Sequence, residues 1–172
     1  RGVPADYAAA AEWYRKGAEQ DDEECACCLG YLYETGEGVP QSWEEAVRWY
    51  RKSAEQNLPR AQCNLAWCYE HGKGVERDLA EALTWYRRAA EQEDARGLFS
   101  VARAYDYGLG VERNAEEAAR WYARAVDAGS AYAMCDLGVC YERGEGVPQD
   151  FDRAAELYQK AADAGNPPGQ CN

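Results

Sequence analysis

The chain has 172 residues, 47% hydrophobic and 29% charged, and its 31 acidic and 19 basic residues give a formal net charge of -12 at pH 7. This charge has the wrong sign for neutralising phosphates, so we expect no nucleic-acid partner. No apolar stretch approaches the ~20 residues of a membrane-spanning helix, and we expect no membrane span within the sequence.

A step of 36 residues repeats along the whole sequence. Gly-Val pairs recur without insertion or deletion at positions 2, 38, 74, 110 and 146. Trp-Tyr pairs follow the same step from positions 13, 49, 85 and 121, and the last copy has Leu157-Tyr158. A fixed period of about 20 to 50 residues is typical of a solenoid. We therefore predict a single repeat domain over 1–172, with units 3–38, 39–74, 75–110 and 111–146 and a partial unit 147–172.

Each unit is predicted to begin with a helix whose N-cap side chain has an oxygen acceptor. The residues in this slot are Asp6, Ser42, Asp78, Asn114 and Asp150. Glu45, Glu81 and Glu117 follow three residues later and predict a capping box in the middle copies. Apolar and small residues recur at the spacing of one buried helical face, which in the second copy comprises Ala46, Trp49, Tyr50, Ser53 and Ala54. This spacing predicts that the Trp-Tyr pairs belong to the core.

A second helix is predicted to complete each unit. The first helix should end at a left-handed residue in the slot of Asp21, Asn57, Glu93, Gly129 and Gly165. The second helix then begins after Asp22, Asp94, Ser130 or Asn166, with Pro59 and Pro167 at its first position. Its buried stripe in the second copy comprises Ala61, Leu65, Cys68, Tyr69 and Gly72. Such helix pairs cannot bury a face alone and must stack, so the predicted fold class is all-α, built of helix-turn-helix repeats.

The sequence of residues 61–75 resembles a known repeat family. It reads Ala-Gln-Cys-Asn-Leu-Ala-Trp-Cys-Tyr-Glu-His-Gly-Lys-Gly-Val and is followed by Asp78, Ala82, Trp85-Tyr86 and Ala89-Ala90. This pattern resembles the Sel-one-like repeat family, a branch of the tetratricopeptide-like (TPR-like) α/α solenoids, and the resemblance covers the chain in unbroken register. It implies a right-handed α/α superhelical solenoid that acts as a non-enzymatic scaffold or adaptor and binds a protein or peptide on its concave face.

The resemblance also implies that the second helices line that concave face. At about 100° per residue, the slots of Cys63, Asn64, Trp67, Glu70 and His71 point away from the buried stripe. The Trp67 and His71 slots vary between repeats, whereas the intervening slot is always acidic and holds Glu34 in the first copy. The candidate binding residues are Tyr31, Trp67, Glu70, His71, Arg103, Asp106, Tyr107, Glu142 and Arg143.

Two interpretations of these slots stay open. The first is a groove of aromatic anchors over an acidic ladder, suited to a basic or arginine-containing peptide. The second is that the acidic slot serves helix packing or solvation. End-to-end association of copies through the terminal helices is a further expectation about partners.

The eight cysteines are expected to be free thiols that act as small hydrophobes, which favours the cytoplasm. Their spacing along one helix and between copies is unsuited to disulfide bonds. An alternative is a thiol-based zinc or redox site at Cys25, Cys27 and Cys28, although zinc requires further ligands. Because the sequence starts at Arg1 without Met and ends inside an expected helix, we expect a fragment of a longer protein, which leaves secretion or a periplasmic location open.

No catalytic constellation emerges from the sequence. It contains no H-E-x-x-H, no phosphate-binding glycine loop and no G-x-S-x-G motif, and His71 is the single histidine. We therefore expect no enzymatic activity, no cofactor and no metal ion. A hydrolase of the kind suggested for some cysteine-rich relatives is an alternative that lacks a nucleophile signature.

Overall fold

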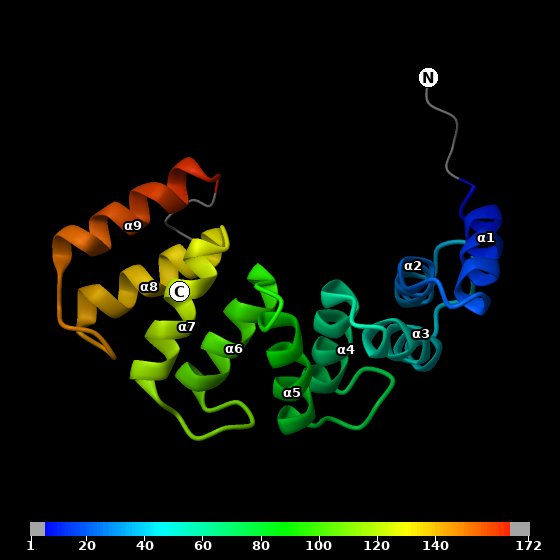
Figure 1. The fold of residues 1–172 in the computed structure, drawn as a ribbon, viewed down its shortest axis with the longest axis horizontal. Coiled ribbons are helices and arrows are strands. Elements are labelled where there is room, and N and C mark those ends of the chain that lie inside the picture. The colour runs from blue at the N-terminus through cyan, green and yellow to red at the C-terminus, as the bar shows by residue number, and fades with distance from the viewer. Residues whose placement is uncertain (1–5, 166–172) are drawn as a thin grey trace. The chain divides into compact units, whose positions relative to one another are not determined.

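The computed structural model describes residues 6–165, and these form nine α-helices joined by short turns (Figure 1). In chain order they are α1 (Tyr7–Glu19), α2 (Glu23–Thr35), α3 (Trp43–Glu55), α4 (Pro59–His71), α5 (Leu79–Ala90), α6 (Ala95–Tyr107), α7 (Ala115–Asp127), α8 (Ala131–Arg143) and α9 (Phe151–Asp163). In this part of the chain no helix combines the length and the apolar character that crossing a membrane requires. The predicted all-α succession of helix pairs is confirmed, and the expected cap at Asn166 and Pro167 lies outside the described residues.

The chain divides into two units between Trp85 and Tyr86, inside α5. In the first unit α2 packs against both α1 and α3, and α3 packs against α4. In the second unit α7 packs against both α6 and α8, and α8 packs against α9. Each unit is therefore a succession of packed helices, and each is described by itself.

The first helices begin at the predicted N-caps. The cap side chains accept hydrogen bonds from backbone N–H groups three residues on: Asp6 from Ala9 (3.0 Å), Ser42 from Glu45 (3.2 Å), Asp78 from Glu81 (3.0 Å), Asn114 from Glu117 (3.1 Å) and Asp150 from Arg153 (2.9 Å). The prediction of a complete capping box is wrong, because the glutamate side chain does not accept the hydrogen bond of the N-cap N–H. The backbone N–H groups of Ser42, Asp78 and Asn114 donate instead to the carbonyl oxygens of Tyr33, Tyr69 and Tyr105 in the preceding second helix. The tertiary contact thus replaces the glutamate that the local pattern predicted.

The predicted left-handed residues end the first helices. Asp21 (φ 63°), Asn57 (φ 74°) and Glu93 (φ 57°) adopt this conformation, and Gly129 (φ 88°) and Gly165 (φ 82°) adopt it in the later copies. A side chain in the left-handed region costs roughly 1–2 kcal/mol that glycine avoids. The copies that end in Asp21 and Glu93 therefore contain local strain.

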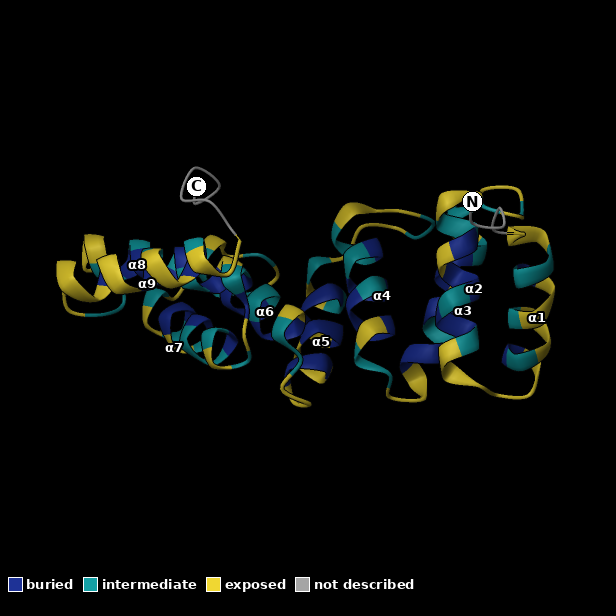
Figure 2. Ribbon diagram, turned by 90° about the horizontal axis from the view of Figure 1, so that it is seen from above, coloured by how far each residue is buried: buried dark blue, intermediate teal, exposed yellow. Residues whose placement is uncertain are grey.

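The core follows the predicted helical spacing in α3, whereas in the predicted buried stripe of α4 Tyr69 is half-buried and Gly72 is exposed. The predicted face of α3 is buried at all five positions, Ala46, Trp49, Tyr50, Ser53 and Ala54. Trp13, however, is 71% exposed, whereas Trp49 in the same slot is 8% exposed, so the prediction that every Trp-Tyr pair is core is wrong for Trp13. Trp49 belongs to a cluster with Leu29 and Leu32 of the preceding repeat. No helix precedes α1 in the described part of the chain, and Figure 2 shows α1 as mostly exposed or half-buried.

Candidate functional site

The second helices adjoin one another within each unit. In the first unit, Asn64 Nδ2 of α4 lies 4.0 Å from Cys27 Sγ of α2. In the second unit, the rings of Phe99 of α6 and Tyr132 of α8 have centroids 6.0 Å apart. The predicted site residues therefore lie on two adjoining helices in each unit, α2 and α4 or α6 and α8.

The acidic slot binds the tyrosine of the following first helix. Tyrosine Oη atoms donate hydrogen bonds from Tyr50 to Glu34 (2.5 Å), from Tyr122 to Asp106 (3.2 Å) and from Tyr158 to Glu142 (2.6 Å). Burial and the neighbouring carboxylates raise the pKa of Tyr50 and Tyr122 far above the usual value, and raise the pKa of Tyr158 to about 12. These three carboxylates therefore join successive repeats, as the packing interpretation of the slot requires. Contact of Glu70, Asp106 or Glu142 with a partner stays a prediction.

Trp67 lies in the middle of three stacked rings in the first unit. Its centroid is 5.7 Å from that of Trp43, with an interplanar angle of 30°, and 4.3 Å from that of His71, with an angle of 22°. His71 Nδ1 lies 2.9 Å from the carbonyl oxygen of Trp67, and Lys73 Nζ lies 5.8 Å from the Trp43 centroid. Trp43, Trp67 and His71 are called the aromatic stack below. The two indoles are half-buried and the imidazole is exposed.

Trp43 was not among the predicted site residues. Its slot is the first residue of a first helix, and aromatic or aliphatic residues also fill this slot in α1, α5 and α9. That recurrence is the sequence signal for it. Tyr31, which was predicted, occupies the Trp67 slot one repeat earlier on α2 and is 51% exposed.

A hollow of about 380 Å³ lies between α6 and α8 in the second unit. Its lining residues are Asp106, Tyr107, Arg113, Asp136, Val139, Cys140, Arg143 and Glu145. Three of them, Asp106, Tyr107 and Arg143, were predicted. Asp136 was not, although it is the one acidic residue in the slot that holds Cys28, Asn64 and Ser100 in the other copies.

Charged side chains of both signs surround this hollow. Burial, and then the negative charge of Asp106, raises the pKa of Asp136 to about 6. Arg113 Nη2 lies 3.9 Å from Asp106 Oδ1 and 3.8 Å from Glu145 Oε2. Tyr107 is 58% exposed at the edge, and the predicted Arg103 lies with its guanidinium carbon 6.0 Å from the Tyr107 ring. The arrangement offers an aromatic surface beside polar groups. Burial and the neighbouring carboxylates raise the pKa of the Cys140 thiol in its lining to about 12, which disfavours a nucleophilic thiolate.

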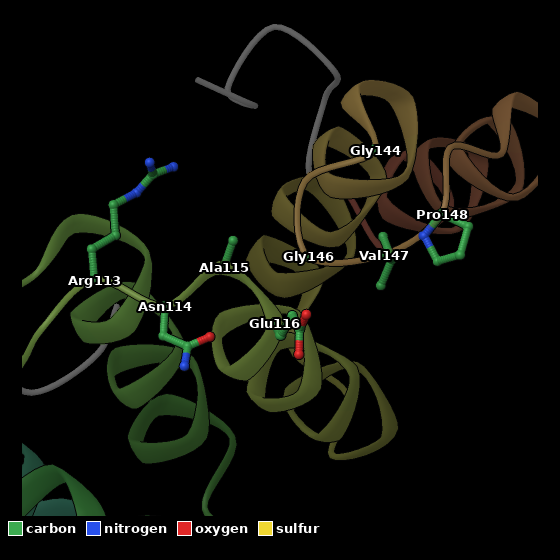
Figure 3. Close-up of a pocket in the computed structure, with 8 residues that line it drawn as sticks. All are labelled: Arg113, Asn114, Ala115, Glu116, Gly144, Gly146, Val147 and Pro148. Atoms are coloured by element: carbon green, nitrogen blue, oxygen red, sulfur yellow. The ribbon is translucent and has the colours of Figure 1, made fainter.

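A larger hollow of about 760 Å³ in the same unit is a product of repeat packing (Figure 3). The start of α7 and the turn between α8 and α9 line it, with Arg113, Asn114, Ala115, Glu116, Gly144, Gly146, Val147 and Pro148. The Asn114 side chain already caps α7. Gly146 is in the left-handed region (φ 72°), and a Cβ there would collide with the carbonyl oxygen of Ala115. Capping and close backbone packing thus account for these residues.

The structure gives no support to the alternative zinc or redox site at Cys25, Cys27 and Cys28. Between residues 6 and 165, no group of three or more His, Cys, Asp and Glu side chains is placed to hold a metal ion. Cys27 is buried, and the other two are half-buried. Burial raises the pKa of the Cys25 and Cys27 thiols, which disfavours the reactive thiolate.

The expectation of free thiols is wrong for Cys135, which is disulfide-bonded. The other cysteines of the described residues form no disulfide bond, namely Cys25, Cys27, Cys28, Cys63, Cys68 and Cys140. The expectation used distances between helix axes, and the 4.0 Å between Asn64 Nδ2 and Cys27 Sγ shows that an axis distance does not measure how closely two side chains approach. Cys63, expected to point outwards, is fully buried.

These features define an α-helical repeat protein whose packing residues recur and whose outward second-helix residues vary. The model of the Sel1 repeat matches residues 1–22, 24–58, 59–94, 95–130 and 131–166. The chain belongs to the Sel1 repeat family. The family repeat joins a second helix to the following first helix, so it starts half a unit away from the predicted boundaries.

Solved structures agree with this assignment. The chain is similar to a Sel1 repeat protein from Oxalobacter formigenes, with a TM-score of 0.90 and 38% identity over 96% of this chain and 68% of that chain. It is also similar to a protective antigen of uropathogenic Escherichia coli strains that displays an SLR fold, with a TM-score of 0.91 and 37% identity over 96% of this chain. The match spans 36% of the length of that antigen.

A more distant likeness concerns the fold alone. Cysteine-rich protein B of Helicobacter pylori has a TM-score of 0.58 and 20% identity over 73% of this chain and 90% of that chain. No curated protein matches the chain. Sel1 repeats generally mediate protein–protein interaction, and proteins of this family are typically non-catalytic scaffolds.

Proposed function

We propose that this chain is a non-enzymatic scaffold that binds a protein or peptide segment through outward side chains of its second helices, on α2 and α4 and on α6 and α8. The contrast between two slots of the same repeat supports this proposal. The packing slot is tyrosine in every copy, at positions 14, 50, 86, 122 and 158. The outward slot changes completely, through Tyr31, Trp67, Arg103 and Val139, and these residues are half-buried or exposed.

Surface chemistry points to a partner with basic character. Tyr31 and Tyr107 expose more than half of their surface, and exposed aromatic side chains are enriched at protein interfaces. The net charge of -12 attracts a basic segment and increases its rate of association. The alternative hydrolase lacks such support, because the Cys140 thiol at the hollow between α6 and α8 has its pKa raised to about 12 by burial and neighbouring carboxylates, which disfavours the nucleophilic thiolate.

A random peptide library displayed on phage tests the proposal. We expect selection against the chain to enrich peptides whose affinity falls at least about tenfold in the double variant Tyr31→Ala, Tyr107→Ala. The matched control is Trp13→Ala, which removes an exposed aromatic ring from a first helix and should leave binding unchanged. Peptides that bind the double variant as well as they bind the wild type would contradict the proposal, provided that both unfold at the same urea concentration.

End-to-end self-association is a second candidate interaction, and the exposure of α1 favours it. The α3 slots of Ala46, Trp49 and Tyr50 are buried, whereas the corresponding α1 residues are half-buried or, at Trp13, exposed. We expect sedimentation velocity to show a concentration-dependent dimer that Trp13→Ala abolishes. A monomer at every concentration would exclude this interaction.

A further inference from the structure

We infer that Tyr31 and the aromatic stack form an anchoring surface for a segment of another protein that carries an arginine or lysine next to a hydrophobic side chain. This inference rests on the function proposed above, and it names both the chemistry of the partner and the place where it binds in the first unit.

The fold does not require the stack. Arg103 occupies the Trp67 slot in α6, yet α4 and α6 both have 13 residues and both end at a left-handed glycine, Gly72 or Gly108. A tryptophan at this slot leaves apolar surface half-buried on the outside of a helix. Two neighbouring rings stack on it and hold it in place, so binding would immobilise it at little further entropic cost.

Several other aromatic rings already have an arginine side chain of the same protein as a neighbour. Arginine guanidinium carbons lie 6.0 Å from the ring of Tyr69, 5.7 Å from Tyr105, 4.4 Å from Trp121 and 5.1 Å from Tyr141. At one end of the stack, Lys73 lies over Trp43. No basic side chain among residues 6–165 lies over Tyr31 or Trp67. A partner cation can therefore approach these two side chains without displacing one of the chain's own.

Carboxylates complete the complementarity to a basic residue. Glu34 follows Tyr31 by three residues on α2, and Glu70 follows Trp67 by three residues on α4, so each glutamate neighbours the aromatic residue on the helix surface. The carboxylate of Glu34 accepts a hydrogen bond from Tyr50, and its remaining lone pairs can accept others. An arginine can thus stack its alkyl stem and guanidinium on a ring and donate to the adjacent carboxylate, while its hydrophobic neighbour packs against the indole edges.

The repeats themselves supply the test variants. Trp67→Arg introduces the residue of the third repeat, and the milder His71→Thr introduces the residue that the first repeat has in that slot, Thr35. The probe is a labelled synthetic peptide with the consensus sequence enriched by the phage library. We expect a consensus with arginine or lysine beside Leu, Phe or Trp, and an affinity at least about tenfold lower for Trp67→Arg.

Three measurements complete the experiment. Trp13→Arg makes the same exchange on α1 and should leave affinity unchanged. His71→Thr should weaken binding about threefold or more. This variant keeps the test decisive if the urea midpoint of Trp67→Arg differs from that of the wild type. Replacing the basic residue of the peptide with glutamine, or raising the salt concentration, should weaken binding.

The outcomes separate this inference from the proposed function. A consensus without basic residues, or full affinity in a folded Trp67→Arg or His71→Thr variant, overturns the anchoring surface. If such peptides still lose affinity in the Tyr107→Ala variant, binding through the second helices stands. If no selected peptide depends on any second-helix residue, both proposals fail.

Discussion

Replacing Tyr50 with phenylalanine removes the hydroxyl that joins the second repeat to the first. The Tyr50 ring is fully buried, and its Oη donates a 2.5 Å hydrogen bond to the Glu34 carboxylate. Hydrogen bonds to charged groups contribute about 1.5–3 kcal/mol to stability. Because Glu34 is half-buried and can regain water, we expect Tyr50→Phe to lower the free energy of unfolding by about 1.5 kcal/mol, the lower end of that range.

Urea unfolding followed by circular dichroism measures this change. A loss of this size corresponds to a fall of about 3–6 °C in Tm for a chain of this length. The matched control is Tyr14→Phe in the same slot of α1. Tyr14 is half-buried, and its hydroxyl makes no hydrogen bond within the described part of the chain, so we expect a change below about 0.5 kcal/mol.

Equal effects of Tyr50→Phe and Tyr14→Phe would refute the reasoning. They would mean that water replaces the tyrosine at Glu34 without a free-energy cost and that the acidic slot does not stabilise repeat packing. An altered dependence of the unfolding free energy on urea, rather than a shifted midpoint, would instead indicate that the two repeats no longer unfold together.

Three further predictions concern other parts of the chain. Trp49→Ala should destabilise the fold by about 3–5 kcal/mol and Trp13→Ala by less than about 1 kcal/mol, as measured by urea unfolding, because only the first leaves a cavity between repeats. The pKa of Asp136 is raised to about 6 from 3.8, so its protonated form stabilises the fold at pH 4 and this stabilisation is lost as the pH rises through 6. Asp136→Asn should therefore raise the unfolding free energy by about 1 kcal/mol at pH 8, after allowance for solvent screening, and by much less at pH 4. Cys135 should resist alkylation in denaturant until a reductant is added, as mass spectrometry of the peptides can show.

Features that depend on local sequence were predictable. The caps at Ser42 and Asn114 and the left-handed turn at Asn57 follow from the residue types at these positions, and the turn at Glu93 follows from the glycines that hold its slot in later copies. The exposure of Trp13 was not predictable in this way, because its local sequence matches that of buried copies. The difference is the absence of a preceding helix in the described chain, which no local pattern records.

The candidate site was predictable only in part for a similar reason. Helical spacing placed Tyr31, Trp67 and Tyr107 on the outward face, and they are half-buried or exposed there. Trp43 and Asp136 were missed because the role of each depends on a residue of a different helix. Trp43 stacks on a residue of α4, and Asp136 faces the charge of Asp106 on α6.

The acidic slot also limits which substitutions can demonstrate binding. Asp106 and Glu142 each accept a hydrogen bond from a tyrosine of the next repeat, so replacing them alters packing as well as surface charge. Lost affinity in such a variant would not distinguish a partner contact from a loosened repeat. The Trp67 and His71 slots lack this ambiguity, since the other repeats fold with quite different residues there. Binding measurements at these two slots therefore report on recognition, while tyrosine substitutions in the packing slot report on stability.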